Sequence, residues 1–307
     1  MKTKSNLERI LEDGKFAVTA EIGTPQNTET EMIRERVNLL KGYVDAFNVP
    51  DGQAAVVAMA SWATSLIGIE GGIDPIVHMT CRDRNRIALQ MDILGFCAFG
   101  VNNVLCVSGD PISFGNQPNA KPVFDVDSIE LIRIVKRLRD EKKLENGQQI
   151  LGKEPRLYIG AAANPFSQSM ESELNRLKDK IDAGADFVQT QPVYNIEGFE
   201  KWMELVRGEG LHKNAKILVG ITPLTSVASA RYMQTKLPNM DIPSEIIERL
   251  RNISRKEDMA EMGIVIAVET INRLREIEGV AGIHIMTLGR EEIIPKICNA
   301  VGLYPRP

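Results

Sequence analysis

The stretch Lys-Ile-Asp-Ala-Gly-Ala-Asp-Phe-Val-Gln-Thr-Gln, residues 180–191, contains a helix end, a turn and a strand in immediate succession. The helix is expected to end at Gly184, because glycine tolerates the left-handed backbone that helix ends require. Phe187 and Val188 form the apolar body of the strand, which closes with three polar residues, the last of them Gln191. A buried parallel strand is normally apolar, and the carboxyl ends of such strands face the ligand. We therefore select Gln191 as a candidate binding residue.

The same alternation of helix and strand recurs along the chain. Eight short apolar runs are expected to be strands: Phe16–Ile22, Ala46–Val49, Pro75–Thr80, Asn103–Val107, Leu157–Ala162, Asp186–Thr190, Lys216–Ile221 and Gly282–Thr287. Helical patterns lie between them, at Thr30–Gly42, Arg84–Phe99, Val126–Lys143, Ser169–Ala183, Ile196–Val206 and Asp258–Ile277. This order predicts an α/β fold, a (β/α)8 TIM barrel that forms a single domain over residues 1–307 with a short N-terminal helix. An open doubly wound sheet is the alternative, but no GxGxxG motif supports its dinucleotide-binding version.

Composition limits the partners that the chain is expected to have. Its 37 basic and 41 acidic residues give a net charge of −4, which argues against nucleic acid or an anionic membrane. No apolar segment reaches the roughly 20 residues of a membrane helix, and residues 1–14 lack a signal-peptide core. A cytoplasmic protein is expected. The four cysteines form no CxxC pair, so we expect reduced thiols and no metal site.

Hydrogen-bonding residues end most of the expected strands, and in a barrel these positions meet at one face. Glu21 ends the first strand, where partial burial raises the pKa of a carboxyl and permits proton donation near neutral pH; a salt-bridged barrel residue is the alternative. Asp110 follows Gly109, which lets a ligand approach closely, although an aspartate that starts a turn is equally compatible. Other residues at this face are Asn48, His78, Ser108, Ala162, Asn164, Thr222 and Thr287.

Three of the candidate residues also have a purely structural interpretation. A lone strand histidine such as His78 is more often a core group than a ligand, and no second histidine or carboxylate stands nearby at metal spacing. Arg290 could hold an anion or pair with the acids that follow it, and Lys180 could complement the dipole of its helix. Cys81 is not favoured as a nucleophile, because residues an odd number apart on a strand, such as His78 and Cys81, point to opposite faces.

Seven motifs at strand–helix boundaries together resemble the methylenetetrahydrofolate reductase family, over about residues 15–304. They are Glu21 with Pro25, His78-Met79-Thr80-Cys81, Ser108-Gly109-Asp110, Lys180-Ile181-Asp182-Ala183-Gly184-Ala185, Thr190-Gln191, Gly220-Ile221-Thr222-Pro223, and His284-Ile285-Met286-Thr287-Leu288-Gly289-Arg290. The family fold is a (β/α)8 barrel. The chain carries no C-terminal regulatory extension and so looks like the short catalytic form, similar to that of acetogenic bacteria.

The resemblance implies flavin-dependent reduction of methylenetetrahydrofolate to methyltetrahydrofolate. By similarity, Glu21 is the general acid that opens the five-membered ring, and Asp110 lies between flavin and pterin, where its charge favours the cationic intermediate. Gln191 binds the pterin edge, and Arg290 lies toward the folate. The flavin site is expected to contain Asn48, His78, Ser108, Asp110, Ala162, Asn164 and Lys180, with Lys180 on the phosphate side.

Departures from the family pattern cluster on the cofactor side. Pro50 stands where relatives often have threonine, Ser108 replaces a common arginine, and Ala163 to Phe166 replace an aromatic residue and a histidine. FAD is the family default and FMN the alternative. NADH, NADPH or an electron-delivering protein subunit could supply the electrons, and a homo-oligomer is a family expectation.

Two other functions are compatible with the sequence. The first is a flavin-free pterin- or folate-binding barrel enzyme of the methyltransferase or synthase type, for which the missing arginine at Ser108 is the best support. The second is a barrel subunit that is active only with an electron-delivering partner. That function predicts an apolar outer patch, which the helical, Met- and Ala-rich stretch Ala54–Ile67 could supply.

Overall fold

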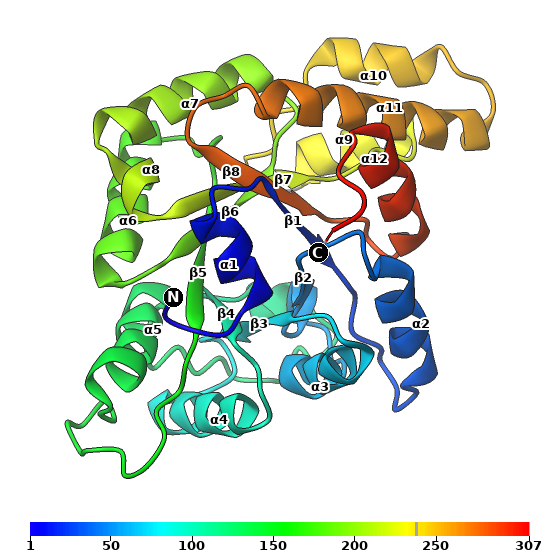
Figure 1. Cartoon of the computed structure of the whole chain (residues 1–307). Coiled ribbons are helices and arrows are strands. Elements are labelled where there is room, and N and C mark those ends of the chain that lie inside the picture. The colour runs from blue at the N-terminus through cyan, green and yellow to red at the C-terminus, as the bar shows by residue number, and fades with distance from the viewer. Residues whose placement is uncertain (237–238, 307) are drawn as a thin grey trace.

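Eight parallel strands close into a barrel in which each strand pairs with its neighbours in chain order (Figure 1). The computed structural model describes residues 1–236 and 239–306. β1 pairs with β8, with Val18 opposite Ile283, and this pairing completes the ring. The predicted TIM barrel is therefore confirmed. The strands are β1 (Ala17–Glu21), β2 (Ala46–Val49), β3 (Pro75–Thr80), β4 (Asn103–Val107), β5 (Tyr158–Ala163), β6 (Phe187–Pro192), β7 (Lys216–Ile221) and β8 (Val280–Ile285).

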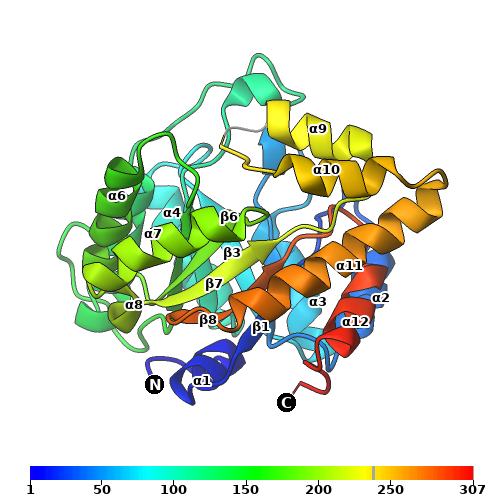
Figure 2. The ribbon, with the colours of Figure 1, turned by 90° about the horizontal axis from the view of Figure 1, so that it is seen from above.

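Helices surround the strands (Figure 1, Figure 2). The α-helices are α1 (Asn6–Glu12), α2 (Glu31–Leu40), α3 (Ser61–Gly71), α4 (Arg86–Ala98), α5 (Ser128–Lys136), α6 (Met170–Ala183), α7 (Ile196–Gly208), α8 (Leu211–Asn214), α9 (Val227–Lys236), α10 (Ser244–Arg251), α11 (Lys256–Leu274) and α12 (Ile294–Ala300). Short helical turns are η1 (Gln53–Ala55), η2 (Ile112–Phe114), η3 (Arg137–Glu141, a π-helix) and η4 (Glu291–Ile293).

Helix α1 closes the end of the barrel at which the strands begin (Figure 1). Its apolar residues follow the i, i+3, i+4 spacing of an amphipathic helix, and Ser5 caps it by accepting a hydrogen bond from the Glu8 N–H. Leu7 and Ile10 are fully buried, in one cluster with the stacked rings of Tyr158 and Phe187. A ligand site inside the barrel can therefore open only at the other end, where the strands terminate.

The stretch Ala54–Ile67 is not one helix, so that prediction was wrong. Ala54 belongs to the short turn η1 and has φ of 53°, a left-handed conformation, and the next helix begins only at Ser61. This helix, α3, turns Thr64 and Ile67 inward. The stretch therefore supplies no continuous outer patch.

Strand ends differ by one or two residues from the predicted ones. β8 begins at Val280, which pairs with Ile217 of β7, and ends two residues before Thr287. β6 continues to Pro192 through an irregular register after Gln189. Within the described part of the chain, no helix has the length and apolar character needed to cross a membrane.

Candidate functional site

Glu21, the last residue of β1, is a buried carboxyl at the mouth of the barrel. Only 9% of it is exposed, and this desolvation raises the pKa of Glu21 to about 7. The side-chain amide of Gln53, on η1, donates to Glu21 Oε1 over 3.4 Å and opposes the rise, since it favours the ionised carboxylate. A carboxyl with such a pKa can hold and release a proton near neutral pH.

A second carboxylate, Glu291 of η4, lies near Glu21 and was missed as a site residue. Glu291 is 3% exposed, and its negative charge adds to the rise in the pKa of Glu21. Arg36 pairs with it over 3.2 Å and also donates to the Gly23 carbonyl, which links the end of β1 to η4. In the sequence, only the adjacency of Glu291 to Arg290 indicated that it stands at the mouth.

The carboxylate of Asp110 binds another loop and not the turn that follows Asp110 itself. Its Oδ2 accepts a hydrogen bond from the Ala54 N–H at 2.8 Å, so it binds the loop that follows β2. The same loop carries Gln53, and it therefore contacts both carboxylates. Ala54 and Ala55 have positive φ values, which cost energy in non-glycine residues and concentrate at functional sites. This strained loop connects the two predicted catalytic residues.

A polar layer crosses the interior of the barrel below the mouth. Asn48 and Gln189 exchange amide hydrogen bonds of 2.6 and 3.0 Å. The Asn48 amide also donates to His78 Nε2 over 2.8 Å, and Gln189 donates to Thr19 Oγ1 over 3.0 Å. Thr19 in turn contacts His284 Nδ1 at 3.1 Å. The chain of side chains thus joins five strands.

Both histidines of this layer are neutral at physiological pH. Burial lowers the pKa of His78 to about 4 and that of His284 to about 3. His78 lowers the pKa of His284 further, whereas the negative charge of Asp51 partly opposes the fall in the pKa of His78. Asn48 is fully buried, with both ends of its amide bonded in the interior. No second histidine near His78 was expected from the sequence, but the closed barrel brings His284 close enough for His78 to lower its pKa.

The remaining predicted residues fall in two groups. Lys180 is buried on α6 and donates to the Ala162 carbonyl of β5 over 2.7 Å, which fixes the ammonium group at the carboxyl end of that strand. Burial lowers the pKa of Lys180. Asn164 follows β5 and accepts a hydrogen bond from the Phe166 N–H with its side chain. These residues form the β5–α6 side of the mouth.

The second group stands at the exposed rim. Gln191, near the end of β6, and Ser108, after β4, are exposed. Arg290 pairs with Glu292 over 3.3 Å and remains 39% exposed. Large apolar side chains from three βα loops are exposed as well: Val57, Phe114 and Leu288. The mouth thus combines a proton donor, an anion and apolar surface, a combination suited to a flat, polar-edged ring.

Two other chemistries find little support here. Burial raises the pKa of the Cys81 thiol to about 12, so it is not a nucleophile at neutral pH. In the part of the chain that the structure describes, no three His, Cys, Asp or Glu side chains are grouped to hold a metal ion.

The chain is similar to proteins of one family along most of its length. The profile of the family described as methylenetetrahydrofolate reductase matches residues 6–302. A "probable methylenetetrahydrofolate reductase (NADPH)" of Caenorhabditis elegans is 28% identical over 254 residues, which cover 81% of this chain and 35% of that protein. The 5,10-methylenetetrahydrofolate reductase of Buchnera aphidicola is 24% identical over 311 residues, which cover 98% of this chain and 96% of that protein. The chain thus spans about a third of the nematode relative.

A solved structure from Clostridium thermocellum has the same fold. Its TM-score is 0.63 at 16% identity, and the match covers 98% of both chains. That protein is described as an uncharacterized protein that binds two copies of 5-methyl-5,6,7,8-tetrahydrofolic acid.

Proposed function

The chain belongs to the methylenetetrahydrofolate reductase family, and from this premise we propose that it reduces methylenetetrahydrofolate to methyltetrahydrofolate with a bound flavin. The observation that carries the proposal is Glu21, a buried carboxyl at the barrel mouth whose pKa is raised to about 7. A proton donor of this kind is what opening of the substrate's five-membered ring requires.

Each mouth residue has a separate task in this proposal. Glu21 donates its proton to the ring nitrogen that leaves the bridging carbon, and the resulting iminium carbon is ready to accept a hydride. Asp110 supplies a fixed negative charge beside that cation, a contribution that is typically worth a few kcal/mol. Gln191 offers an amide with both donors and an acceptor to the pterin edge, and Arg290 offers a cation to the carboxylates of folate.

The residues of the mouth fit a flavin. The exposed side chains of Val57, Phe114 and Leu288 suit an isoalloxazine ring, which supplies the hydride when it is bound. Lys180, beside Ala162, is the cation that we assign to the phosphate side. His78 and Asn48 are assigned to the floor of the site as neutral hydrogen-bonding groups. We propose FAD, with FMN as the alternative; NADH, NADPH or an electron-delivering protein subunit would reduce it.

An anaerobic half-reaction tests the proposal. The flavin-loaded protein is reduced chemically, mixed with methylenetetrahydrofolate, and followed by the return of the absorbance of oxidised flavin. We expect Glu21→Gln to abolish this reoxidation while flavin binding and chemical reduction persist. Glu204→Gln, an exposed glutamate of α7, is the matched control. Equal loss of flavin binding and reoxidation would mean that Glu21 is structural.

A flavin-free folate-binding barrel enzyme is the second candidate. It is favoured by Ser108, which leaves the phosphate side without a common arginine. One of the three N–H donors of the Lys180 ammonium group is already bound to the Ala162 carbonyl. Protein that stays colourless after incubation with FAD or FMN, but binds methyltetrahydrofolate in calorimetry, would establish this candidate and exclude the first.

A further inference from the structure

Helix α4 is apolar on both of its faces. Leu89, Ile93 and Phe96 pack against the outside of the barrel and are buried. The opposite side, which we name the α4 face, consists of exposed Ile87, Met91, Leu94, Gly95 and Ala98, continued by Phe99 at the end of the helix. In Figure 1, α4 lies at the periphery of the molecule. Polar side chains of α4, such as Gln90 and Asp92, are partly exposed, but an exposed apolar face of this extent is typical of an interaction site, so this face calls for a partner.

Gly95 indicates that the partner is another helix. Glycine destabilises a helix interior, and nothing in the chain requires it here, because a Cβ at position 95 would meet no atom within 4 Å. A small residue in the middle of an exposed helix face does allow a second helix to approach closely. Ala98, one turn further along the same face, is also small and exposed.

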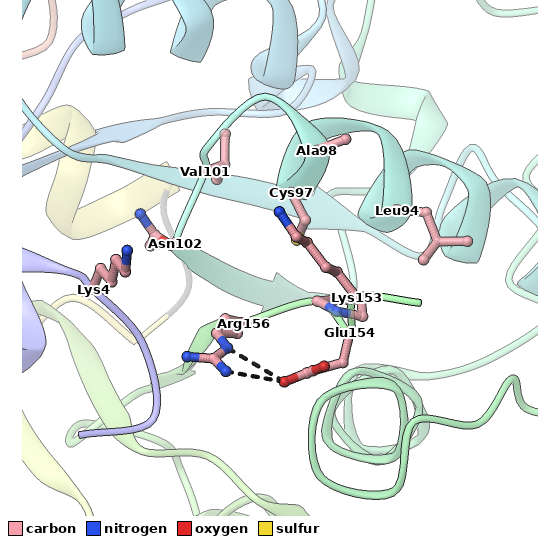
Figure 3. A pocket seen from close by; sticks show the side chains of 10 residues that line it. Lys4, Leu94, Cys97, Ala98, Val101, Asn102, Lys153, Glu154 and Arg156 are labelled. Carbon is pink, nitrogen blue, oxygen red and sulfur yellow. Dashed lines mark hydrogen bonds and ion pairs between the residues drawn. The ribbon is translucent and has the colours of Figure 1, made fainter. Parts of the chain in front are cut away.

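The ends of α4 carry opposite charge. At the amino end, three arginines pair with five acids, so acids are in excess: Arg82, Arg84 and Arg86 against Asp51, Asp83, Asp92, Asp125 and Glu145. The carboxyl end borders a cavity of about 580 Å³, whose apolar wall includes Leu94, Ala98 and Val101 (Figure 3). The other wall of that cavity is mostly basic, with Lys4, Lys153 and Arg156 against a single acid, Glu154.

We propose that the α4 face is the interface between two copies of this chain, which pack their α4 helices antiparallel across a two-fold axis. The face contains no charged residue, so it can meet itself without like-charge repulsion. An antiparallel pairing with Met91 opposite Gly95 also brings Ile87 opposite Phe99. Met91 of each copy then fills the space above Gly95 of the other copy, so that this contact occurs twice in the dimer.

The same orientation matches the charges at the ends. The acidic amino end of each α4 lies beside the basic, cavity-lining carboxyl end of the other, whereas a parallel pairing would place like charge against like. Ile87 of each copy then reaches the apolar wall of the other copy's cavity. This inference does not depend on the reaction proposed above, since it concerns only the outer surface.

Sedimentation equilibrium of the full chain tests the interface. We expect a dimer, and at least a tenfold higher dissociation constant for Met91→Lys, which places two ammonium groups at the centre. Leu205→Lys, at an exposed leucine of α7, is the matched control and should dimerise like the unmodified chain. Circular dichroism checks that both variants are folded. A monomer at all concentrations, or a dimer unaffected by Met91→Lys, overturns the proposal.

Cross-linking tests the antiparallel orientation. In a Cys97→Ser background, a mixture of Met91→Cys and Gly95→Cys proteins should form a mixed disulfide dimer faster than either protein forms one with itself. Leu205→Cys should remain uncross-linked at the same concentration. Preferential cross-linking of each variant with itself would refute the antiparallel pairing. A chain that stays monomeric and binds a different protein through this face would refute the second copy as its occupant.

Discussion

The Gln53→Met substitution tests how the pKa of the proton donor is set. Gln53 donates to Glu21 Oε1 over 3.4 Å and so stabilises the ionised carboxylate. A hydrogen bond to a charged group is worth about 1.5–3 kcal/mol. For a long bond from an exposed donor we take about 1 kcal/mol, which corresponds to an increase of about 0.7 in the pKa of Glu21 once the donor is removed.

The expected effect on rate follows from the protonated fraction of Glu21. With a pKa of about 7, roughly a tenth of Glu21 is protonated at pH 8; with the increase, roughly a third is. Reoxidation of the reduced flavin by methylenetetrahydrofolate should therefore be about threefold faster in the variant at pH 8. At pH 6 the two proteins should agree within about twofold, because Glu21 is largely protonated in both.

Stopped-flow absorbance across pH 5.5–9 is the assay, and Gln148→Met, an exposed glutamine remote from the mouth, is the control. The rate of flavin reoxidation should fall with rising pH in all three proteins, and this fall should move to higher pH in Gln53→Met only. A fall that stays at the same pH would refute the reasoning, because either Gln53 does not act on Glu21 or Glu21 does not supply the proton.

Three further outcomes are expected. Folding raises the pKa of Glu21 from 4.5 to about 7, so the folded state loses stability as the pH rises through that interval. Glu21→Gln, which stays neutral, should therefore be about 2–3 kcal/mol more stable than the unmodified chain at pH 8 and equally stable at pH 4. Chemical unfolding at the two pH values measures the difference. Asp110→Asn should slow flavin reoxidation by folate about 10²-fold or more while flavin affinity, measured by fluorescence, changes little. Breaking the buried pair of Arg139 and Asp186, 2.6 Å long, with Arg139→Met should cost about 3–5 kcal/mol in urea unfolding, whereas Lys296→Met, which breaks an exposed pair, should cost less than about 1 kcal/mol.

Much of the fold could be predicted because its signal is local. Each strand is a short apolar run, and each helix that follows is a periodic pattern, so eight repeats define the barrel without any long-range information. The failure at Ala54–Ile67 has a tertiary cause. Alanine favours helices, but Asp110 binds the Ala54 N–H and Gly115 packs against the Ala55 carbonyl, and these contacts hold the loop in left-handed turns.

The site was only partly predictable for a related reason. Glu21 and Asp110 stand at strand ends, where the sequence alone indicates exposure to the mouth. Gln53 and Glu291 act on Glu21 from two other connections, and only the closed barrel brings them together. Gln189 was read as part of the polar strand end, yet it lies inside the barrel, because side chains two residues apart share a face but differ in depth.

The polar layer inside the barrel has a consequence for how this sequence can diverge. Asn48 and Gln189 belong to strands on opposite sides of the ring, and each satisfies hydrogen-bonding groups that have no access to water. An aliphatic replacement at one of them leaves the amide of the other without a hydrogen-bond partner in the interior. Replacing both together removes both amides and therefore leaves neither of them unpaired. We therefore expect homologues either to keep both Asn48 and Gln189 or to replace both, so that the residues at these two positions change together.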